Sequence, residues 1–427
     1  MNICILGLWH LGCVVSACVA SKGHRVVGID TNPEIIKNLN QGKAPIYEPY
    51  LDKLIKKRLK SGNLTFTDNK KKAEKADILW VTFDTPLNEM DNANDTNIKK
   101  EVIKIMPYLK RNTIILFSSQ LPVGSIKRIK SLSEKRFPHK KFKFACTPEN
   151  LRLGNALKIF LNPDRVVIGI YDKNTKNILK NFFKTITNKI EWMKIESAEM
   201  TKHAINTFLA TSIVFSNEVA SICEKVGADY SEVEKGLKSD QRIGKKAYLS
   251  AGKPIAGGTL LRDVNFLNIK KNKTKLKLPL LSSIILSNNN HKNWISNKIL
   301  ENFSNISNIS ITIWGLTYKP HTDSLRRSLS IDLCKWLIKN GAKINVYDPI
   351  VKKLPIYLNN KVKMFNQPLE SIKNSDILVI GTYSPKFNKI VKKIHLISKK
   401  KLIIIDPNND LKIKTLKSSL RYITFGK

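Results

Sequence analysis

The stretch that decides the fold is residues 2–30, which begin Asn-Ile-Cys-Ile-Leu-Gly-Leu-Trp-His-Leu-Gly and end Arg-Val-Val-Gly-Ile-Asp. The apolar run at 2–6 predicts a buried strand, residues 13–21 predict a helix, and residues 25–29 predict a second strand. A strand, a glycine turn, a helix and a second strand within about thirty residues form the βαβ unit that binds dinucleotides. We therefore expect a doubly wound α/β domain here.

The turn and the second strand indicate which cofactor binds. Gly7 gives the turn its backbone freedom, Gly12 lets helix and strand pack closely, and the helix N-terminus can hold a pyrophosphate. Asp30 lies where a carboxylate accepts hydrogen bonds from ribose hydroxyls and repels the 2′-phosphate of NADP. We therefore predict NAD as the cofactor. The residues expected to hold it are Gly7, Trp9, His10, Leu11, Gly12, Asp30 and Thr85.

Trp9 departs from this pattern. The middle position is normally glycine, which allows the backbone to approach the pyrophosphate. Either the indole points away from the cofactor or the cofactor shifts.

Three further strands are expected at 77–83, 113–118 and 142–146. In doubly wound sheets the carboxyl ends of the strands form the binding crevice, so the loops that follow these strands should converge. Glu149 is the only carboxylate of the loop 147–150. Taken alone, it would be interpreted as a solvated loop residue.

Residues 196–226 predict one long helix, because neither proline nor glycine interrupts them. Lys202 and Asn206 are four residues apart and so share a face. The helix also carries a wide apolar surface, as a central or dimer-forming helix would. A glycine-rich loop is expected at 252–263, and the Lys-, Asn- and Ser-rich residues 268–308 contain a domain boundary.

A second α/β unit begins with a strand at 309–314, followed by a helix to Asn340 and a strand at 343–347 that ends at Asp348. The fold class expected is α/β, with two Rossmann-like doubly wound domains joined by a central long-helix domain. The domain boundaries expected are 1–195, 196–295 and 296–427.

Composition limits the partners. The chain has 427 residues, with 74 Lys+Arg against 34 Asp+Glu and a net charge of +40. The basic residues are spread along the chain beside abundant Asn and Ile, so we expect neither nucleic acid nor a membrane as partner; attraction of an anionic substrate is compatible with this charge. Six scattered cysteines without a CxxC pair predict no metal site and no disulfide framework, and favour the cytoplasm.

Taken together, the motifs resemble the UDP-glucose/GDP-mannose dehydrogenase family over essentially the whole chain. The matching stretches are 26–30, 45–49 (Pro-Ile-Tyr-Glu-Pro), 147–149, 199–202, Asn206, 208–210, 216–218, 242–244, 315–319, Asp323, Arg326 and Ser328. The resemblance implies NAD-dependent oxidation of a nucleotide sugar, UDP-glucose-like, at C6 in two hydride transfers. It also implies a homodimer through the central helix and a C-terminal domain that holds the nucleotide.

The resemblance assigns roles to single residues. Lys202, Asn206, Asp263 and Glu149 would be catalytic, holding water, stabilising an alkoxide and moving protons. The substrate-binding residues implied are Arg242 (from the neighbouring subunit), Tyr248 and Lys319.

The departures from the family surround one site. Thr259 stands where the family has a nucleophilic cysteine that forms a thioester, and no cysteine lies between 223 and 334. Gln120 replaces a catalytic threonine, Leu153 a glutamate, and Asn408 a substrate-binding arginine. A threonine hydroxyl is a far weaker nucleophile than a thiolate unless a base activates it.

We therefore expect oxidation without a thioester, either stopping at the aldehyde or oxidising its hydrate. Cys146 is the one candidate for a replacement nucleophile. The alternatives are a non-catalytic protein that binds a sugar nucleotide or NAD on the same fold, and a nucleic-acid-associated protein that uses the +40 charge.

Overall fold

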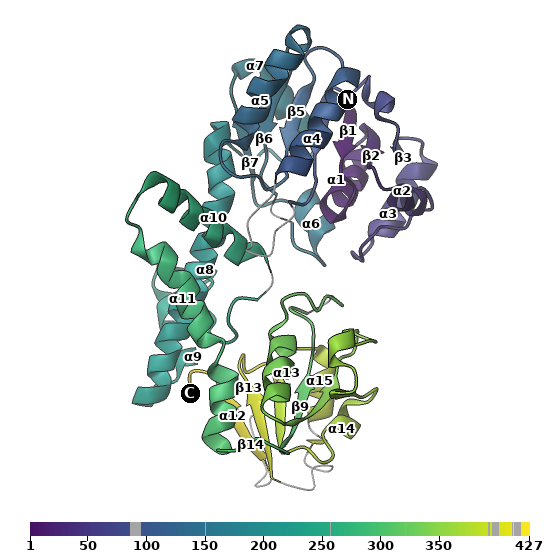
Figure 1. Cartoon of the computed structure of the whole chain (residues 1–427). Helices are drawn as coiled ribbons and strands as arrows, with labels where there is room; N and C mark the ends of the chain where they lie inside the picture. The colour runs from purple at the N-terminus through teal and green to yellow at the C-terminus, as the bar shows by residue number, and fades with distance from the viewer. Residues whose placement is uncertain are drawn as a thin grey trace. The chain divides into compact units, whose positions relative to one another are not determined.

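The computed structural model describes the chain except for residues 86–94, 150, 257, 321, 392, 395–400, 412 and 414–419, and the side chains of 270–273. Its contacts divide the chain into two compact units, Met1–Ile205 and Asn206–Lys427. Each unit contains one β-sheet flanked by helices (Figure 1). Helix α8 (Ile195–Val226) runs through the division between the units.

The first unit is built on an eight-stranded sheet with the order β3-β2-β1-β4-β5-β6-β7-β8. Neighbouring strands are parallel except for the antiparallel pair β6–β7. The strands are β1 (Asn2–Leu6), β2 (Arg25–Ile29), β3 (Leu64–Thr67), β4 (Ile78–Val81), β5 (Ile114–Phe117), β6 (Lys143–Cys146), β7 (Val166–Ile170) and β8 (Ile190–Met193). The helices are α1 (His10–Ser21), α2 (Pro33–Asn40), α3 (Leu51–Lys60), α4 (Thr96–Ile105), α5 (Ser125–Arg136), α6 (Ala156–Leu161) and α7 (Lys173–Phe183).

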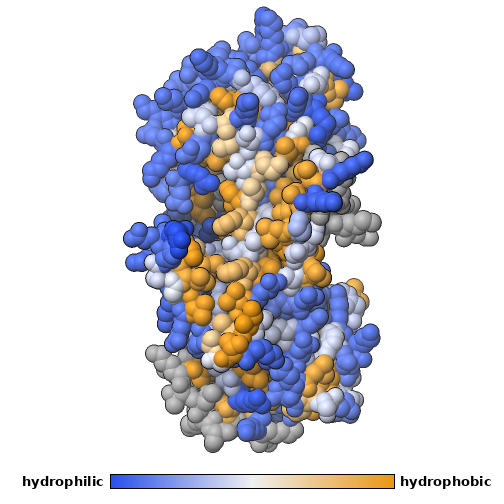
Figure 2. Space-filling view, turned by 90° about the vertical axis from the view of Figure 1, so that its left-hand side faces the viewer, coloured by the Kyte–Doolittle hydropathy of each residue, from blue (hydrophilic) through white to orange (hydrophobic). Residues whose placement is uncertain are grey.

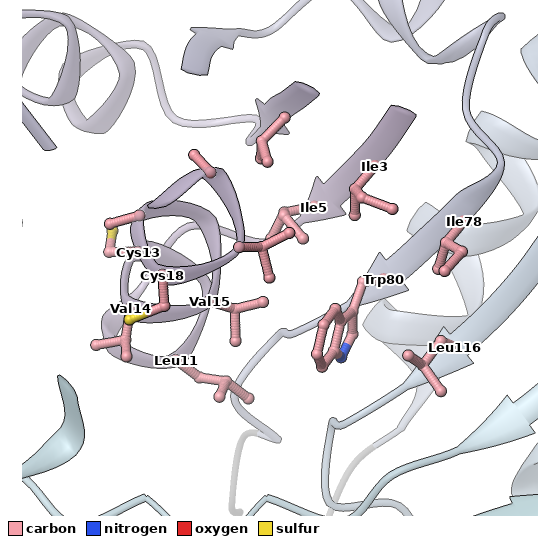
Figure 3. Close-up of a cluster of buried hydrophobic side chains, with 14 of the residues drawn as sticks. Ile3, Ile5, Leu11, Cys13, Val14, Val15, Cys18, Ile78, Trp80 and Leu116 are labelled. Carbon is pink, nitrogen blue, oxygen red and sulfur yellow. The ribbon is translucent and has the colours of Figure 1, made fainter. Parts of the chain in front are cut away.

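The central strands β4 and β5 are buried along their whole length, which explains why their sequences are continuously apolar. On one face Ile3 and Ile5 of β1 pack with α1, whose Val15 lies toward Trp80 of β4 (Figure 3). Cys4 of β1 faces the other side, in a second buried cluster with residues of α4 and α5. The Trp80 indole donates a hydrogen bond of 2.8 Å to Ser118 Oγ, which satisfies its buried N–H.

The second unit combines helices with a six-stranded parallel sheet of order β11-β10-β9-β12-β13-β14. Its strands are β9 (Ser310–Trp314), β10 (Lys343–Tyr347), β11 (Val362–Met364), β12 (Ile377–Ile380), β13 (Leu402–Asp406) and β14 (Leu420–Thr424). Its helices after α8 are α9 (Tyr230–Ser239), α10 (Thr259–Thr274), α11 (Pro279–His291), α12 (Trp294–Asn302), α13 (Leu329–Lys339), α14 (Pro368–Ser371) and α15 (Pro385–Val391). The expected fold class, two doubly wound sheets with a long central helix, is confirmed.

Several element bounds differ from expectation. Helix α1 begins at His10 rather than at residue 13. The glycine-rich loop ends before residue 259, because α10 begins at Thr259 and therefore carries Asp263 on a helix. The expected division at 295/296 falls inside α12. Within the described residues, none of the helices has both the length and the apolar character needed to cross a membrane.

Candidate active site

The glycine turn after β1 has the geometry that a bound dinucleotide needs. Gly7 has φ +97°, and its N–H donates to the Ile29 carbonyl oxygen at 2.9 Å. A Cβ added at Gly12 would lie 1.8 Å from the Gly7 carbonyl oxygen, so only glycine allows α1 to approach β1 this closely. The same Gly7 oxygen accepts a 2.7 Å hydrogen bond from Thr82 Oγ1 on the neighbouring loop.

Asp30 lies beside this turn at the carboxyl end of β2. Its carboxylate is buried and accepts hydrogen bonds from the backbone N–H of Leu8, at 2.6 Å, and of Asn32, at 3.0 Å. Each carboxylate oxygen has two lone pairs, so acceptor capacity remains for ribose hydroxyls. Trp9 is the N-cap residue of α1 and is 42% exposed. The turn, the helix N-terminus and Asp30 fit NAD.

His10, the first residue of α1, is held by a carboxylate that our sequence analysis noted only as part of a motif. Glu48 is buried, and it accepts hydrogen bonds from His10 Nε2 at 2.9 Å, Gly154 N at 2.8 Å and Ala156 N at 2.9 Å. Glu48 thus ties the loop 45–49 both to α1 and to the start of α6. Its neighbour Tyr47 is 80% exposed, so the burial of Glu48 could not be inferred from its surroundings in the sequence.

The loops after β4, β5 and β6 meet as expected. Thr85 Oγ1 donates to the Gln120 carbonyl oxygen at 2.7 Å, and Ser118 Oγ donates to the Thr147 carbonyl oxygen at 2.7 Å. These two bonds join the three loops that carry Thr85, Gln120 and Glu149.

Glu149 lies half-buried where these loops meet. Burial raises the pKa of its carboxyl above the ordinary value of 4.5, and the nearby charge of Asp84 acts in the same direction. The positive charges of Lys202 and His10 and a hydrogen bond from the Leu151 backbone oppose this rise in pKa. A carboxylate whose pKa is raised takes up a proton more readily than an ordinary one, and Glu149 lies next to the positive charge of Lys202.

Lys202 is positioned by its neighbours on α8. The Glu199 carboxylate accepts hydrogen bonds from Gly124 N at 2.6 Å and Ile126 N at 3.1 Å, so it caps the start of α5. His203 Nε2 lies 3.1 Å from the Leu121 carbonyl oxygen. These contacts dock the first turns of α8 against the loop 120–124. In the sequence these residues belong to the Glu-Met-Thr-Lys motif at 199–202. The contacts of its glutamate, Glu199, are structural.

In the second unit the structure brings Asn206 and Asp263 together. Asn206 Nδ2 donates a hydrogen bond to Asp263 Oδ2, and both side chains are buried. Arg262 Nε lies 3.7 Å from Asp263 Oδ1. Because this carboxylate is fully buried, the cation and the amide balance its desolvation.

The loop before α10 is held from several sides. Gly252 N donates to Asn217 Oδ1 at 2.9 Å, and Ile255 N donates to Asn288 Oδ1 at 2.7 Å. Lys253 N donates to Asn408 Oδ1 at 2.9 Å. Asn408, where the resembled family has an arginine, therefore binds the loop backbone in this chain.

Thr259 is the first residue of α10 and is exposed. All six cysteines lie in the described part of the chain as buried, unpaired thiols. For Cys146, burial and the charge of Glu199 raise the thiol pKa well above its ordinary value. None of these thiols has the exposed, electropositive surroundings that a thiolate nucleophile needs.

Of the three expected substrate-binding residues, Arg242 and Tyr248 are exposed and Lys319 is half-buried. Arg242 forms an exposed ion pair with Asp240, with Nη2–Oδ2 at 2.7 Å, and this pairing lowers the pKa of Asp240. Tyr248 is 59% exposed. Lys319 Nζ lies 5.4 Å above the Tyr318 ring. Across the ranges that the structure describes, no group of three or more His, Cys, Asp or Glu residues could hold a metal ion.

Known proteins match the whole chain. Residues 1–187 match the NAD binding domain of the UDP-glucose/GDP-mannose dehydrogenase family, 196–290 its central domain, and 312–412 its UDP binding domain. The UDP-glucose 6-dehydrogenase YwqF of Bacillus subtilis is 34% identical over 385 residues, 90% of this chain and 87% of that protein. The UDP-glucose 6-dehydrogenase of Rickettsia bellii is 32% identical over 100% of this chain and 99% of that protein.

A solved structure agrees. That of a UDP-glucose dehydrogenase from Pyrobaculum islandicum superposes with a TM-score of 0.88 at 25% identity, covering 99% of this chain and 96% of that one. With the dinucleotide turn, Asp30 and the three matched domains, the chain belongs to the UDP-glucose/GDP-mannose dehydrogenase family and is an NAD-dependent oxidoreductase of the nucleotide-sugar dehydrogenase type.

Proposed function

We propose that this protein oxidises C6 of a UDP-glucose-like nucleotide sugar without forming a thioester on the enzyme. The observation that carries the proposal is that Thr259 begins α10 while every cysteine of the chain is buried. The relatives that match the full chain are named UDP-glucose 6-dehydrogenases, which supports this choice of substrate. NAD, when bound, accepts the hydride that leaves C6.

The protein's own groups move the proton and stabilise charge. Oxidation of the C6 alcohol to the aldehyde releases one proton with the hydride. Lys202 would stabilise the developing alkoxide by its positive charge, and Glu149, whose pKa burial raises, would take up the proton. For a second oxidation Glu149 would first release this proton to solvent and then activate the water that forms the aldehyde hydrate, whose hydride would pass to a second NAD. Asn206 and Asp263, which are hydrogen-bonded to each other, would orient this water. Thr259 and Gln120 are the two further residues that we propose take part in catalysis.

The residues proposed to bind NAD and the nucleotide sugar are those named from the sequence. Gly7, Trp9, His10, Leu11, Gly12, Asp30 and Thr85 would hold NAD. The substrate diphosphate carries two negative charges, which Lys319 and Arg242 would neutralise, with Tyr248 beside them. Arg242 would come from the neighbouring subunit.

The assembly proposed is a homodimer through the central helix. Phe208, Phe215 and Ile222 recur at seven-residue spacing on α8 and are 71%, 47% and 60% exposed. Side chains at this spacing share one helix face. Apolar side chains gather on the face of the molecule that carries α8 and α11 (Figure 2). An exposed apolar stripe of this kind indicates a protein interface.

The domain division proposed is 1–195 for NAD binding, 196–295 for dimerisation and 296–427 for the sugar nucleotide. The location proposed is the cytoplasm, since the cysteines are free thiols.

The proposal is tested by incubating the enzyme with UDP-glucose and NAD. The amount of NADH formed per sugar is measured, and the mass of the intact protein is determined by mass spectrometry. We expect no covalent sugar adduct, and activity that survives thiol alkylation and Cys146→Ser. Two NADH per sugar with free aldehyde detected would indicate that the acid is formed, and one NADH would indicate that the reaction stops at the aldehyde. A thioester trapped on Cys146 would contradict the mechanism. Absence of NADH formation with a panel of nucleotide sugars would indicate a binding protein.

A further inference from the structure

The second sheet repeats two features of the first: a glycine turn after one strand, and an aspartate directly after the neighbouring strand, which we call the acid-tipped strand. Gly315 has φ +85°, and its N–H donates to the Tyr347 carbonyl oxygen at 2.8 Å, as Gly7 does to Ile29 at 2.9 Å. Asp348 directly follows β10, as Asp30 directly follows β2. In both units the acid-tipped strand lies between the strand before the glycine turn and the next strand outward.

The two carboxylates are also presented alike. Asp348 Oδ2 accepts from Leu316 N at 2.7 Å, matching the bond from Leu8 N to Asp30 Oδ2 at 2.6 Å. Asp348 Oδ1 accepts from the backbone N–H of Ile350 at 2.8 Å and of Val351 at 2.9 Å. Oδ2 therefore keeps one lone pair in addition to its backbone bond. The carboxylate that is proposed to bind a ribose in the first unit, Asp30, therefore has a counterpart in the second unit, Asp348.

A cavity of about 510 Å³ lies at this carboxylate. It is lined by the residues that follow β10 and β11 and by residues of α14 and α15. Phe365, Leu369 and Ile390 provide apolar wall suitable for a flat base. Its volume is within the range of small-molecule sites, about 300–1,000 Å³.

The charge around this cavity indicates an anion. Among the described residues that line it, Asp348 is the single carboxylate, whereas Lys352, Lys386 and Lys389 are cations. All three lysines are exposed and so remain able to turn toward a ligand. Lys319, the residue expected to bind the substrate nucleotide, follows β9 and is not among the lining residues.

The geometry points to a second nucleotide site in the C-terminal sheet, which takes a purine nucleoside diphosphate. Its ribose hydroxyls would bind Asp348, its base would pack on Phe365, and its phosphates would bind Lys386 and Lys389. We take the base to be a purine by analogy with the adenosine half of a dinucleotide, whose place beside the second strand of a doubly wound sheet this cavity shares. This inference does not depend on the proposed reaction.

The test is calorimetric titration of the full-length enzyme with ADP in the presence of saturating NADH and UDP, which occupy the cofactor and substrate sites. We expect one ADP per chain under these conditions. Lys389→Glu should weaken ADP binding about tenfold or more, because it replaces a charge-assisted bond to phosphate by repulsion. Lys339→Glu, the same change at an exposed residue of α13 outside the cavity, should leave the Kd unchanged.

A second measurement locates the site. Photolabelling with 8-azido-ADP under the same conditions should modify the peptide that contains residues 362–369. Failure of ADP to bind once NADH and UDP are saturating would overturn the proposal. So would an equal loss for Lys339→Glu, which would indicate a non-specific effect of the +40 charge. None of these readouts requires turnover, so they are independent of the dehydrogenase reaction.

Discussion

At the scale of the residue, Asp30 is committed to two backbone amides before any cofactor binds. Asp30→Ala removes both the ribose acceptor and the charge that repels a 2′-phosphate. We expect the native enzyme to bind NAD at least about tenfold more tightly than NADP, and the variant to narrow this gap. Calorimetry with both cofactors measures the ratio. Equal affinities for the native enzyme would contradict the assignment of Asp30.

The raised pKa of the Glu149 carboxyl affects the stability of the protein as well as its proposed catalytic role. Burial raises its pKa above 4.5, so the folded state binds a proton more tightly than the unfolded state does. The free energy of unfolding therefore falls as the pH rises from the unfolded pKa to the folded pKa. Glu149→Gln keeps the shape without the charge, so it should raise the melting temperature at pH 7.5 and leave it unchanged near pH 4.

The same variant should lose activity by about 10²-fold or more, the usual contribution of a general acid or base. A purely structural Glu149 would show the stability change with activity retained. Asp172→Asn offers a control, because hydrogen bonds from Thr175 lower the pKa of Asp172 despite its desolvation. That substitution should therefore destabilise the protein at pH 7.5.

At the scale of the element, helix α1 depends on one glycine. In Gly12→Ala the new Cβ would meet the Gly7 carbonyl oxygen at 1.8 Å, so the helix must move away from β1. We expect a loss of several kcal/mol in the free energy of unfolding, since overpacking of a close backbone contact typically costs about 1–3 kcal/mol or more. Denaturant unfolding measures this loss.

Gly236→Ala is the matched control for this substitution. Gly236 also lies in a helix, α9, but a Cβ there meets nothing within 4 Å. It should be neutral or stabilise the protein by up to about 1 kcal/mol, because alanine is the better helix former. Equal destabilisation by the two changes would show that helix propensity, rather than contact with Gly7, explains the result.

Helix α8 carries the proposed catalytic lysine. Lys202→Ala removes the charge beside Glu149. We expect kcat to fall by about 10²-fold or more with little change in NAD affinity, as for a group that stabilises developing charge. Steady-state kinetics and calorimetry separate the two effects. Because Lys202 opposes the raised pKa of Glu149, its loss should also shift any pH-rate limb of Glu149 upward.

At the scale of the whole molecule, the apolar stripe of α8 predicts a dimer. Phe208→Asp with Ile222→Asp should convert a dimer to a monomer in sedimentation velocity, because burial of these charges would be unfavourable. Ile356→Asp changes a residue between β10 and β11 that is 89% exposed, and it should leave the dimer intact. A monomeric native enzyme, or equal dissociation by Ile356→Asp, would refute the proposed interface.

Sequence patterning was sufficient for the central strands of both sheets. These strands are short apolar runs, and Gly7 and Asp30 lie at fixed offsets from β1 and β2, so the doubly wound fold could be predicted. The outer strands β3, β8 and β11 contain polar residues and were not predicted. Element bounds were less well predicted, since α10 begins at Thr259, inside the expected glycine-rich loop.

Local sequence patterns were enough to predict the two α/β sheets, the long α8, the position of Asp30 and the presence of Thr259 in place of a thiol. The folded chain was needed to show that Glu48 binds His10 and that Asn408 binds the loop at Lys253. These contacts could not be predicted because the residues that make them are far apart in the sequence. Backbone conformation and side-chain periodicity are set within a few residues, whereas these contacts join residues 38 and 155 positions apart in the chain.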